Sequence, residues 1–317
     1  MERLLEVDDF AHLREVFGPQ DKNLRVLEKE LGVHMYLKPE GLLIKGDKTR
    51  VRTAQQMISK FMQLRKDGLV FNREEIGRYV SSGSQKTEDA YGIKVSSPRK
   101  SFILPKTQGQ HDYIKAMREN DIVFSIGPAG TGKTYLAMAT AVNCLLEKKV
   151  GRIILTRPAI EAGESLGFLP GDMYQKLGPY LRPLYDALYD MLAPELIEEY
   201  IETGVIEVVA LAYMRGRTLN NAFVVLDEAQ NCTTEQLRMF LTRLGFDSKT
   251  VITGDITQSD LPEGRPTGLL EAIKVLKPIQ DIKFVHLTKK DVVRHPLIQK
   301  IIQAYEDFYT AREGSST

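Results

Sequence analysis

The pattern of hydrophobic and polar positions changes partway along the chain. Up to residue 75, apolar residues recur at helical spacing in three stretches, and two short apolar runs at 33–37 and 42–45 flank a Pro-Glu-Gly turn signal. Asp8 or Asp9 is placed to cap the first helix. The pattern predicts a small α+β domain over residues 1–75 with the order helix, helix, strand, strand, helix.

From residue 109 onward, continuous apolar runs alternate with helical patterns. Runs that are apolar at successive positions are typical of parallel strands covered on both faces. Strands and helices in alternation predict an α/β fold with a doubly wound parallel sheet. The expected strands span 122–126, 152–156, 206–211, 223–226, 250–253 and 284–287, and the expected helices span 133–146, 174–192 and 234–244.

Residues 76–108 lie between these two regions and are rich in serine, proline and basic residues. Six basic and two acidic residues leave a local charge of +4 (6 − 2). Two interpretations stay open, a solvated linker or a strand of cationic contacts to nucleic-acid phosphates. The basic residues are Arg78, Lys86, Lys94, Arg99, Lys100 and Lys106, and the acidic residues are Glu88 and Asp89.

Composition narrows the class of protein. Hydrophobic residues make up 43% of the chain and charged residues 27%, as in soluble globular proteins, and the net charge is only +1. Any nucleic-acid surface is therefore a local patch. Cys144 and Cys232 belong to no Cys/His cluster, and the N-terminus lacks the apolar core of a signal peptide. We expect no structural zinc, no membrane span and a cytoplasmic protein.

Residues 127–134 read Gly-Pro-Ala-Gly-Thr-Gly-Lys-Thr and match the phosphate-binding pattern G-x-x-x-x-G-K-[ST] between an expected strand and helix. The glycines let backbone N–H groups turn towards phosphate oxygens, and the helix N-terminus adds its positive dipole end. Lys133 then offers a charge to the terminal phosphates, and Thr134 offers a hydroxyl to Mg²⁺. The alternative is a glycine-rich turn without a chemical role. The residues expected at the nucleotide are Gly127, Pro128, Ala129, Gly130, Thr131, Gly132, Lys133, Thr134 and Tyr135.

Polar groups follow two further expected strands. Asp227 and Glu228 come after the run at 223–226, at the carboxyl edge where open α/β sheets bind ligands. Asp227 suits the Mg²⁺ shell and Glu228 suits orienting and deprotonating a water, although such a pair also caps helices. Asp255 and Gln258, after the last-but-one run, suit sensing of the γ-phosphate or else belong to a tight turn.

Four blocks of sequence resemble the PhoH-like family of P-loop ATPases. They are 126–135 (IGPAGTGKTY), 155–172 (LTRPAIEAGESLGFLPGD), 213–231 (YMRGRTLNNAFVVLDEAQN) and 291–305 (DVVRHPLIQKIIQAY). The resemblance implies a RecA-like ATPase domain at 109–317, similar to the motor half of superfamily 1 helicases, that uses ATP and Mg²⁺. It also implies that Gln110 reads adenine and that Asp255 contacts the nucleotide.

Residues 1–75 resemble the KH-type domain of one, YbeZ-like, branch of this family. That branch is associated with a YbeY-like endoribonuclease of ribosome maturation, so the resemblance implies RNA and this nuclease as partners. A KH domain grips nucleic acid through a GxxG loop between two helices. Here the loop reads Gly18-Pro19-Gln20-Asp21, with an acid in place of the second glycine, which argues against RNA binding in the usual KH manner.

The length that follows residue 108 suffices for one motor domain. An arginine finger typically contributes roughly 10³–10⁵ to the rate of phosphoryl transfer, and two-lobed helicases take it from a second motor domain. We therefore expect it from a neighbouring subunit, and the resemblance points to a homo-hexameric ring. The candidates are Arg294, which follows the last expected strand and is otherwise a surface arginine, and then Arg265, Arg217 and Arg215. Arg157, after the run at 152–156, is expected to contact nucleic acid or phosphate.

Three functions are compatible with these motifs. The first is a Mg²⁺-dependent ATP hydrolase that couples hydrolysis to RNA remodelling or unwinding in RNA or ribosome metabolism, with Lys133, Glu228, Gln258 and Arg294 as its catalytic residues. The second is an ATPase switch that recruits or regulates an endoribonuclease without helicase activity. The third, a nucleotide kinase, fits less well because no arginine-rich lid is visible and Glu228 favours water as the acceptor.

Overall fold

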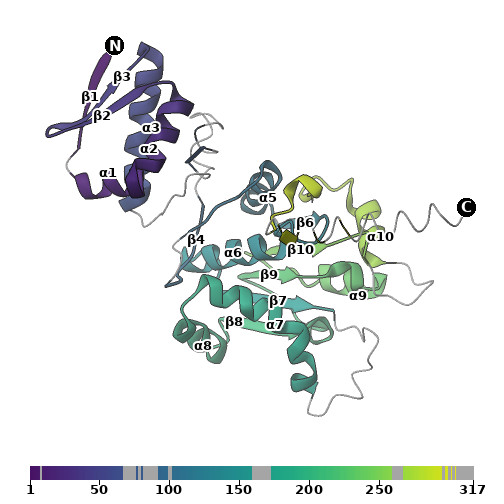
Figure 1. The fold of residues 1–317 in the computed structure, drawn as a ribbon. Coiled ribbons are helices and arrows are strands. Elements are labelled where there is room, and N and C mark those ends of the chain that lie inside the picture. The colour runs from purple at the N-terminus through teal and green to yellow at the C-terminus, as the bar shows by residue number, and fades with distance from the viewer. Residues whose placement is uncertain are drawn as a thin grey trace, which may run out of the picture. The chain divides into compact units, whose positions relative to one another are not determined.

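The structure is a computed structural model in which two compact units are distinguished (Figure 1). One unit comprises Met1–Ile93 and Lys100–Leu104, and the other comprises Lys94–Arg99 and Pro105–Thr317. The residues that the structure describes are 1–7, 9–66, 76–77, 80, 92–98, 102–158, 173–258, 267–294, 297–298, 301 and 304.

The first unit is a three-stranded antiparallel sheet packed against helices (Figure 1). The strand order is β1-β3-β2, and the side chains of Leu13, Leu27, Ile44, Ile58 and Phe61 are fully buried in its core. Its elements are β1 (Glu2–Glu6), α1 (Phe10–Phe17), the 3₁₀ helix η1 (Pro19–Asp21), α2 (Lys22–Leu31), β2 (His34–Lys38), β3 (Gly41–Lys45) and α3 (Lys48–Lys66).

Strand β1 is absent from the predicted order of this unit. Its sequence ERLLE carries three charges in five residues, and four of the five side chains are exposed, so neither burial nor alternation marks it. It is a strand because it pairs with β3, with Leu4 opposite Leu43. The predicted cap is confirmed for Asp9, whose Oδ1 accepts hydrogen bonds from Ala11 N and His12 N at 2.9 and 3.1 Å; Asp8 lies outside the described residues.

The segment 18–21, in which the KH resemblance expects a GxxG loop, contains η1. Gln20 and Asp21 both have positive φ, 56° and 55°, in the left-handed region that favours glycine. Asp21 therefore has a glycine-like backbone conformation and brings a negative charge to this turn.

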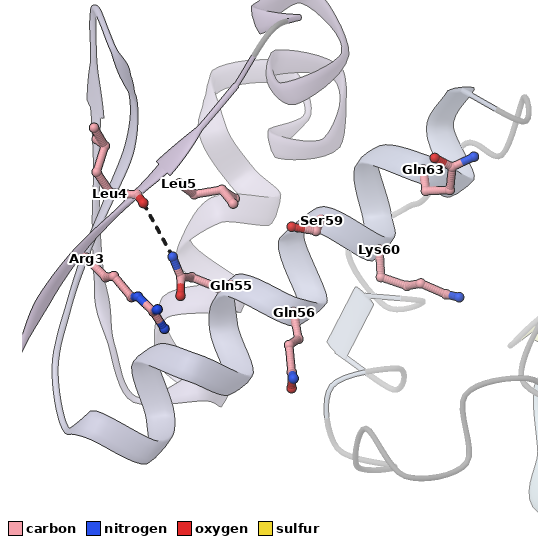
Figure 2. Close-up of a pocket in the computed structure, with 8 residues that line it drawn as sticks. All are labelled: Arg3, Leu4, Leu5, Gln55, Gln56, Ser59, Lys60 and Gln63. Carbon is pink, nitrogen blue, oxygen red and sulfur yellow. Dashed lines mark hydrogen bonds between the residues drawn. The ribbon is translucent and has the colours of Figure 1, made fainter.

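A shallow groove of mixed polar and apolar lining lies between β1 and α3 (Figure 2). Gln55 Nε2 on α3 donates to the Leu4 carbonyl on β1 at 3.4 Å. The α3 sequence contains six basic residues and no acidic one, so the helix carries a net positive charge, although Arg65 is paired with Glu15 of α1. The groove is lined by Arg3, Leu4, Leu5, Gln55, Gln56, Ser59, Lys60 and Gln63.

The second unit is built on a six-stranded parallel sheet in the order β11-β6-β10-β9-β7-β8 (Figure 1). Its strands are β6 (Ile122–Ile126), β7 (Arg152–Arg157), β8 (Ile206–Ala210), β9 (Ala222–Leu226), β10 (Lys249–Gly254) and β11 (Ile282–His286). Its helices are α5 (Gln108–Glu119), α6 (Lys133–Leu146), α7 (Met173–Met191), α8 (Pro194–Glu202), α9 (Thr234–Leu241) and α10 (Gly268–Leu276), with 3₁₀ turns η4 (Leu211–Met214), η5 (Ala229–Asn231) and η6 (Lys289–Asp291).

This RecA-like α/β fold confirms the predicted fold class of the second unit. Helix α6 packs against β7, β9 and β10, and α5 packs against β6 and β11. All six expected strands and all three expected helices are present, and β9 is buried along its whole length. Helices α5, α8 and α10 were not among the expected elements. No helix within the described ranges is long and apolar enough to cross a membrane.

Some described residues of the segment 76–108 belong to the first unit and others to the second. The segment is therefore not a solvated linker along its whole length. The apolar side chains of Ile76 and Val80 are buried in the hydrophobic core of the first unit. In the second unit, Ser96 N donates to Met191 O at 2.9 Å. Strands β4 (Ile93–Lys94) and β5 (Phe102–Ile103) form a two-stranded sheet. Of the six basic residues, Arg78, Lys86, Arg99 and Lys100 lie outside the described residues.

Candidate nucleotide-binding site

The loop 127–132 joins the carboxyl end of β6 to the first residue of α6. Gly130 and Gly132 both have φ of +83°, which a residue with a Cβ adopts only at a cost. A Cβ on Gly127 would lie 2.5 Å from the Leu287 carbonyl oxygen, so the chain after β11 passes too close for any side chain. Glycine is therefore required here for backbone conformation and for close packing, as a phosphate-binding loop demands.

Lys133 opens helix α6 with its ammonium group turned into the loop. Its Nζ donates to the carbonyl oxygens of Gly127 at 2.6 Å and Pro128 at 3.0 Å. Burial lowers the pKa of Lys133 below its ordinary value, against the opposing charges of Asp255, Glu228 and Asp227. The cation is thus desolvated and held where an anion would bind.

The register of three parallel strands brings Asp227 together with two residues far from it in sequence. Leu226 on β9 lies opposite Thr156 on β7 and Ile252 on β10, so the next residue of each strand meets at one point of the sheet edge. These next residues are Arg157, Asp227 and Thr253. Arg157 Nε donates to Asp227 Oδ2 at 2.7 Å, and Thr253 Oγ1 donates to Asp227 Oδ1.

Thr134 completes the surroundings of this buried carboxylate. Its Oγ1 donates to Asp227 Oδ1 at 2.5 Å, so one hydroxyl and one carboxylate oxygen meet beside the phosphate-binding loop. Mg²⁺ prefers oxygen ligands and takes only one or two from protein, completing its shell with water and phosphate. The described residues contain no group of three or more His, Cys, Asp or Glu side chains able to hold a metal, and the Thr134–Asp227 pair fits this sparse kind of site.

Glu228 lies next to this pair in an unusual backbone conformation. Its φ is +57°, a left-handed conformation that costs a non-glycine residue about 1–3 kcal/mol and is concentrated at functional sites. Its side chain is 45% exposed, so water reaches the carboxylate. Gln230 Nε2 donates to Glu228 Oε2 at 2.5 Å and holds that side chain from η5.

Gln230 was not singled out from the sequence, although it lies two residues after the acidic pair in the block Asp-Glu-Ala-Gln. It is buried, and its Oε1 accepts from Asp255 N at 3.0 Å. One amide therefore connects the strand end that carries Glu228 with the strand end that carries Asp255. Its position two residues after Glu228 was the available signal, but only the β9–β10 pairing brings Asp255 N within reach of its side chain.

Asp255 is buried with one of its two carboxylate oxygens unsatisfied. Oδ1 accepts from Thr257 N at 3.0 Å and from Thr257 Oγ1 at 2.6 Å, whereas Oδ2 has no hydrogen-bond partner among the described residues. A buried carboxylate oxygen without a partner among the described residues is a place for a water or a hydrated cation, which also fits Mg²⁺. Gln258 has an exposed side chain, and its N–H donates to Asp255 O at 3.2 Å.

Gln110 and Tyr135 bond to the protein itself. Gln110 is buried; its Oε1 accepts from Lys106 N at 2.7 Å and its Nε2 donates to the Thr131 carbonyl at 3.0 Å. It therefore ties α5 to the phosphate-binding loop, a different contact from the adenine contact expected of it. The Tyr135 hydroxyl donates to Asp190 on α7, so this side chain points to a helix and not to the loop.

The four candidate arginines have different surroundings. Arg294 Nη2 donates to the Ala129 carbonyl of its own chain at 2.7 Å, and Val293 N donates to Gly130 O at 3.0 Å. Arg294 thus lies on its own phosphate-binding loop, because the η6 turn leads the chain back across it. Arg217 is paired with both oxygens of Glu207 at 2.6 Å. Arg215 is exposed, and Arg265 lies outside the described residues.

Comparison with known proteins shows the family of this chain. A family model described as PhoH-like protein matches residues 102–306. The PhoH-like protein of Mycobacterium bovis is 51% identical over 94% of this chain and 86% of its own length, and that of Bacillus subtilis is 48% identical over 92% and 93%. Among solved structures, the Pyrococcus furiosus Hef helicase domain aligns with 58% of this chain and 38% of its own, at 16% identity and a TM-score of 0.37. The chain belongs to the PhoH-like protein family.

Proposed function

We propose that this chain hydrolyses ATP with Mg²⁺ and couples the hydrolysis to remodelling or unwinding of RNA. One observation carries the proposal: Lys133 and Thr134 of the phosphate-binding loop meet Asp227 and a water-accessible Glu228 at one edge of the sheet. A protein that only binds nucleotide needs the loop and the metal ligands. A second carboxylate open to water is the additional group that hydrolysis requires.

The residues divide the reaction between them. Loop N–H groups and Lys133 bind the phosphates, and Thr134 and Asp227 are the residues that would hold Mg²⁺, which when bound neutralises phosphate charge. Glu228 orients a water and accepts its proton as the water oxygen attacks the γ-phosphorus and the bond to the β–γ bridging oxygen breaks, giving ADP and phosphate. Gln230 keeps Glu228 in place through its 2.5 Å hydrogen bond.

RNA as the substrate is supported by the cationic surface of the first unit. Helix α3 carries six basic residues without an acidic one, and the groove beside it is lined by two cations, three glutamines, a serine and two leucines. Polyanions bind such surfaces with release of counterions. The endoribonuclease partner and the six-membered ring implied by the family resemblance stay predictions, and light scattering of the purified chain tests the ring.

The deciding experiment is ATP turnover measured with and without single-stranded RNA, beside Glu228→Gln. We expect turnover that rises with RNA, and a Glu228→Gln variant that binds ATP without splitting it. A turnover rate that does not change with RNA would contradict remodelling and favour an ATPase switch that regulates a partner. Full turnover by Glu228→Gln would remove Glu228 from the reaction.

A further inference from the structure

Arg157 contacts several separate parts of the site. It ends β7, and its side chain is only 16% exposed. Two of its nitrogens bond one oxygen of Asp227: Nε at 2.7 Å, and Nη2 with a shorter contact. Nη2 also lies 3.9 Å from Glu228 Oε1. A single guanidinium therefore faces both carboxylates of the acidic strand end.

The contacts of Asp227 are divided between its two oxygens. Oδ1 accepts from Thr134 and Thr253, on the side of the phosphate-binding loop, whereas Oδ2 accepts from Arg157 alone among the described residues. The two guanidinium N–H groups that contact Asp227 both converge on Oδ2, and this charge-assisted pairing leaves Oδ1 to the hydroxyls beside the loop. Arg157 thus sets which oxygen of Asp227 is presented to the loop.

The same guanidinium is bonded to helix α7. Arg157 Nη1 donates to the Tyr180 carbonyl oxygen at 3.1 Å. A second contact joins α7 to the site, since the hydroxyl of Tyr135, the residue after Thr134, donates to Asp190. Helix α7 is therefore tied to the metal carboxylate on one side and to the start of α6 on the other.

We propose that Arg157 is a positioning residue that orients the Asp227 carboxylate for Mg²⁺ and anchors helix α7 to it. The inference rests on the proposed nucleotide–magnesium site and deepens it, because it assigns to Arg157 a task inside that site and not contact with nucleic acid. Partners that orient a metal-binding carboxylate contribute roughly 10- to 100-fold to metal affinity.

The test is the Mg²⁺ concentration that half-saturates binding of a fluorescent ADP to the full chain, with hydrogen exchange of α7 amides measured in the same samples. In Arg157→Gln we expect this concentration to rise about 10- to 100-fold and the α7 amides near residue 180 to exchange faster. Arg157→Lys separates the two tasks, because one ammonium holds Asp227 but lacks the fork that also reaches Tyr180 O. In Arg157→Lys, the half-saturating Mg²⁺ concentration should stay within about threefold of wild type, whereas the α7 amides should still exchange faster.

Arg182→Gln is the matched control, since Arg182 lies on α7 in an exposed pair with Asp186, and it should change neither measurement. Wild-type Mg²⁺ dependence in Arg157→Gln would overturn the inference. If that variant does not fold, Arg157→Lys decides, and wild-type exchange in α7 overturns the anchoring. If ADP binding by the wild type does not depend on Mg²⁺, the metal site itself is overturned, and with it the proposed function.

Discussion

Gln230→Leu is the substitution that tests the site most directly, because leucine nearly matches glutamine in volume and removes both of its hydrogen-bonding groups. The buried Asp255 N–H, now 3.0 Å from Gln230 Oε1, would lose its acceptor, which costs about 1–3 kcal/mol. The bond to Glu228 adds little to stability because water replaces it at a carboxylate that is 45% exposed. We expect the free energy of unfolding to fall by about 1–3 kcal/mol.

Turnover should fall further than this stability change explains. A general base contributes roughly 10²–10⁴ to a rate, and a Glu228 that is present but no longer held should lose about 10- to 100-fold of kcat with nucleotide affinity unchanged. Steady-state ATP hydrolysis and urea unfolding measure the two quantities.

The matched control is Gln236→Leu. Gln236 is exposed, and its Oε1 accepts from Thr233 N at 2.9 Å in the capping box of α9. Its loss should cost about 0.5–2 kcal/mol without changing kcat. Wild-type kcat in Gln230→Leu would refute the view that Gln230 orients Glu228. An unchanged free energy of unfolding would refute the view that the hydrogen bond from Asp255 N to Gln230 stabilises the fold.

Three further predictions concern the loop and its surroundings. Lys133→Ala should abolish turnover while changing the unfolding free energy by less than about 1 kcal/mol, because its bonds go to carbonyls of its own loop; a measured rate above background would contradict the loop assignment. Burial raises the pKa of Asp291, but hydrogen bonds from Thr107 and Thr288 outweigh it and hold the pKa below 3.8. The stability that Asp291 contributes is therefore present above pH 3.8 and lost as the pH falls towards its folded pKa. In urea unfolding, Asp291→Asn should reduce the loss of unfolding free energy between pH 3.8 and lower pH. An unchanged loss would contradict this role of Asp291. Because Arg294 bonds its own loop, Arg294→Ala mixed with Glu228→Gln should regain no turnover; recovery would show that Arg294 acts on a neighbouring subunit.

The nucleotide-binding loop and its flanking elements could be predicted from the sequence because their causes are local. The expected strand 122–126 and helix 133–146 have the bounds of β6 and α6. A continuous apolar run, two glycines with positive φ and an alanine-rich helix act over a few residues. Strand β1 could not be predicted in this way, because its charged sequence becomes a strand only through pairing with β3, some 40 residues away.

The partners of Asp227 and Glu228 were decided by the tertiary structure. The sequence marked Asp227 and Glu228 but gave no reason to place Arg157, 70 residues earlier, or Thr253, 26 residues later, beside them. Strand order and register do so, because parallel strands in register bring their following residues to one edge. The sequence by itself determined which chemical groups this protein carries to that edge. Only the packing of distant strands, which no short stretch of sequence encodes, decided which of those groups meet.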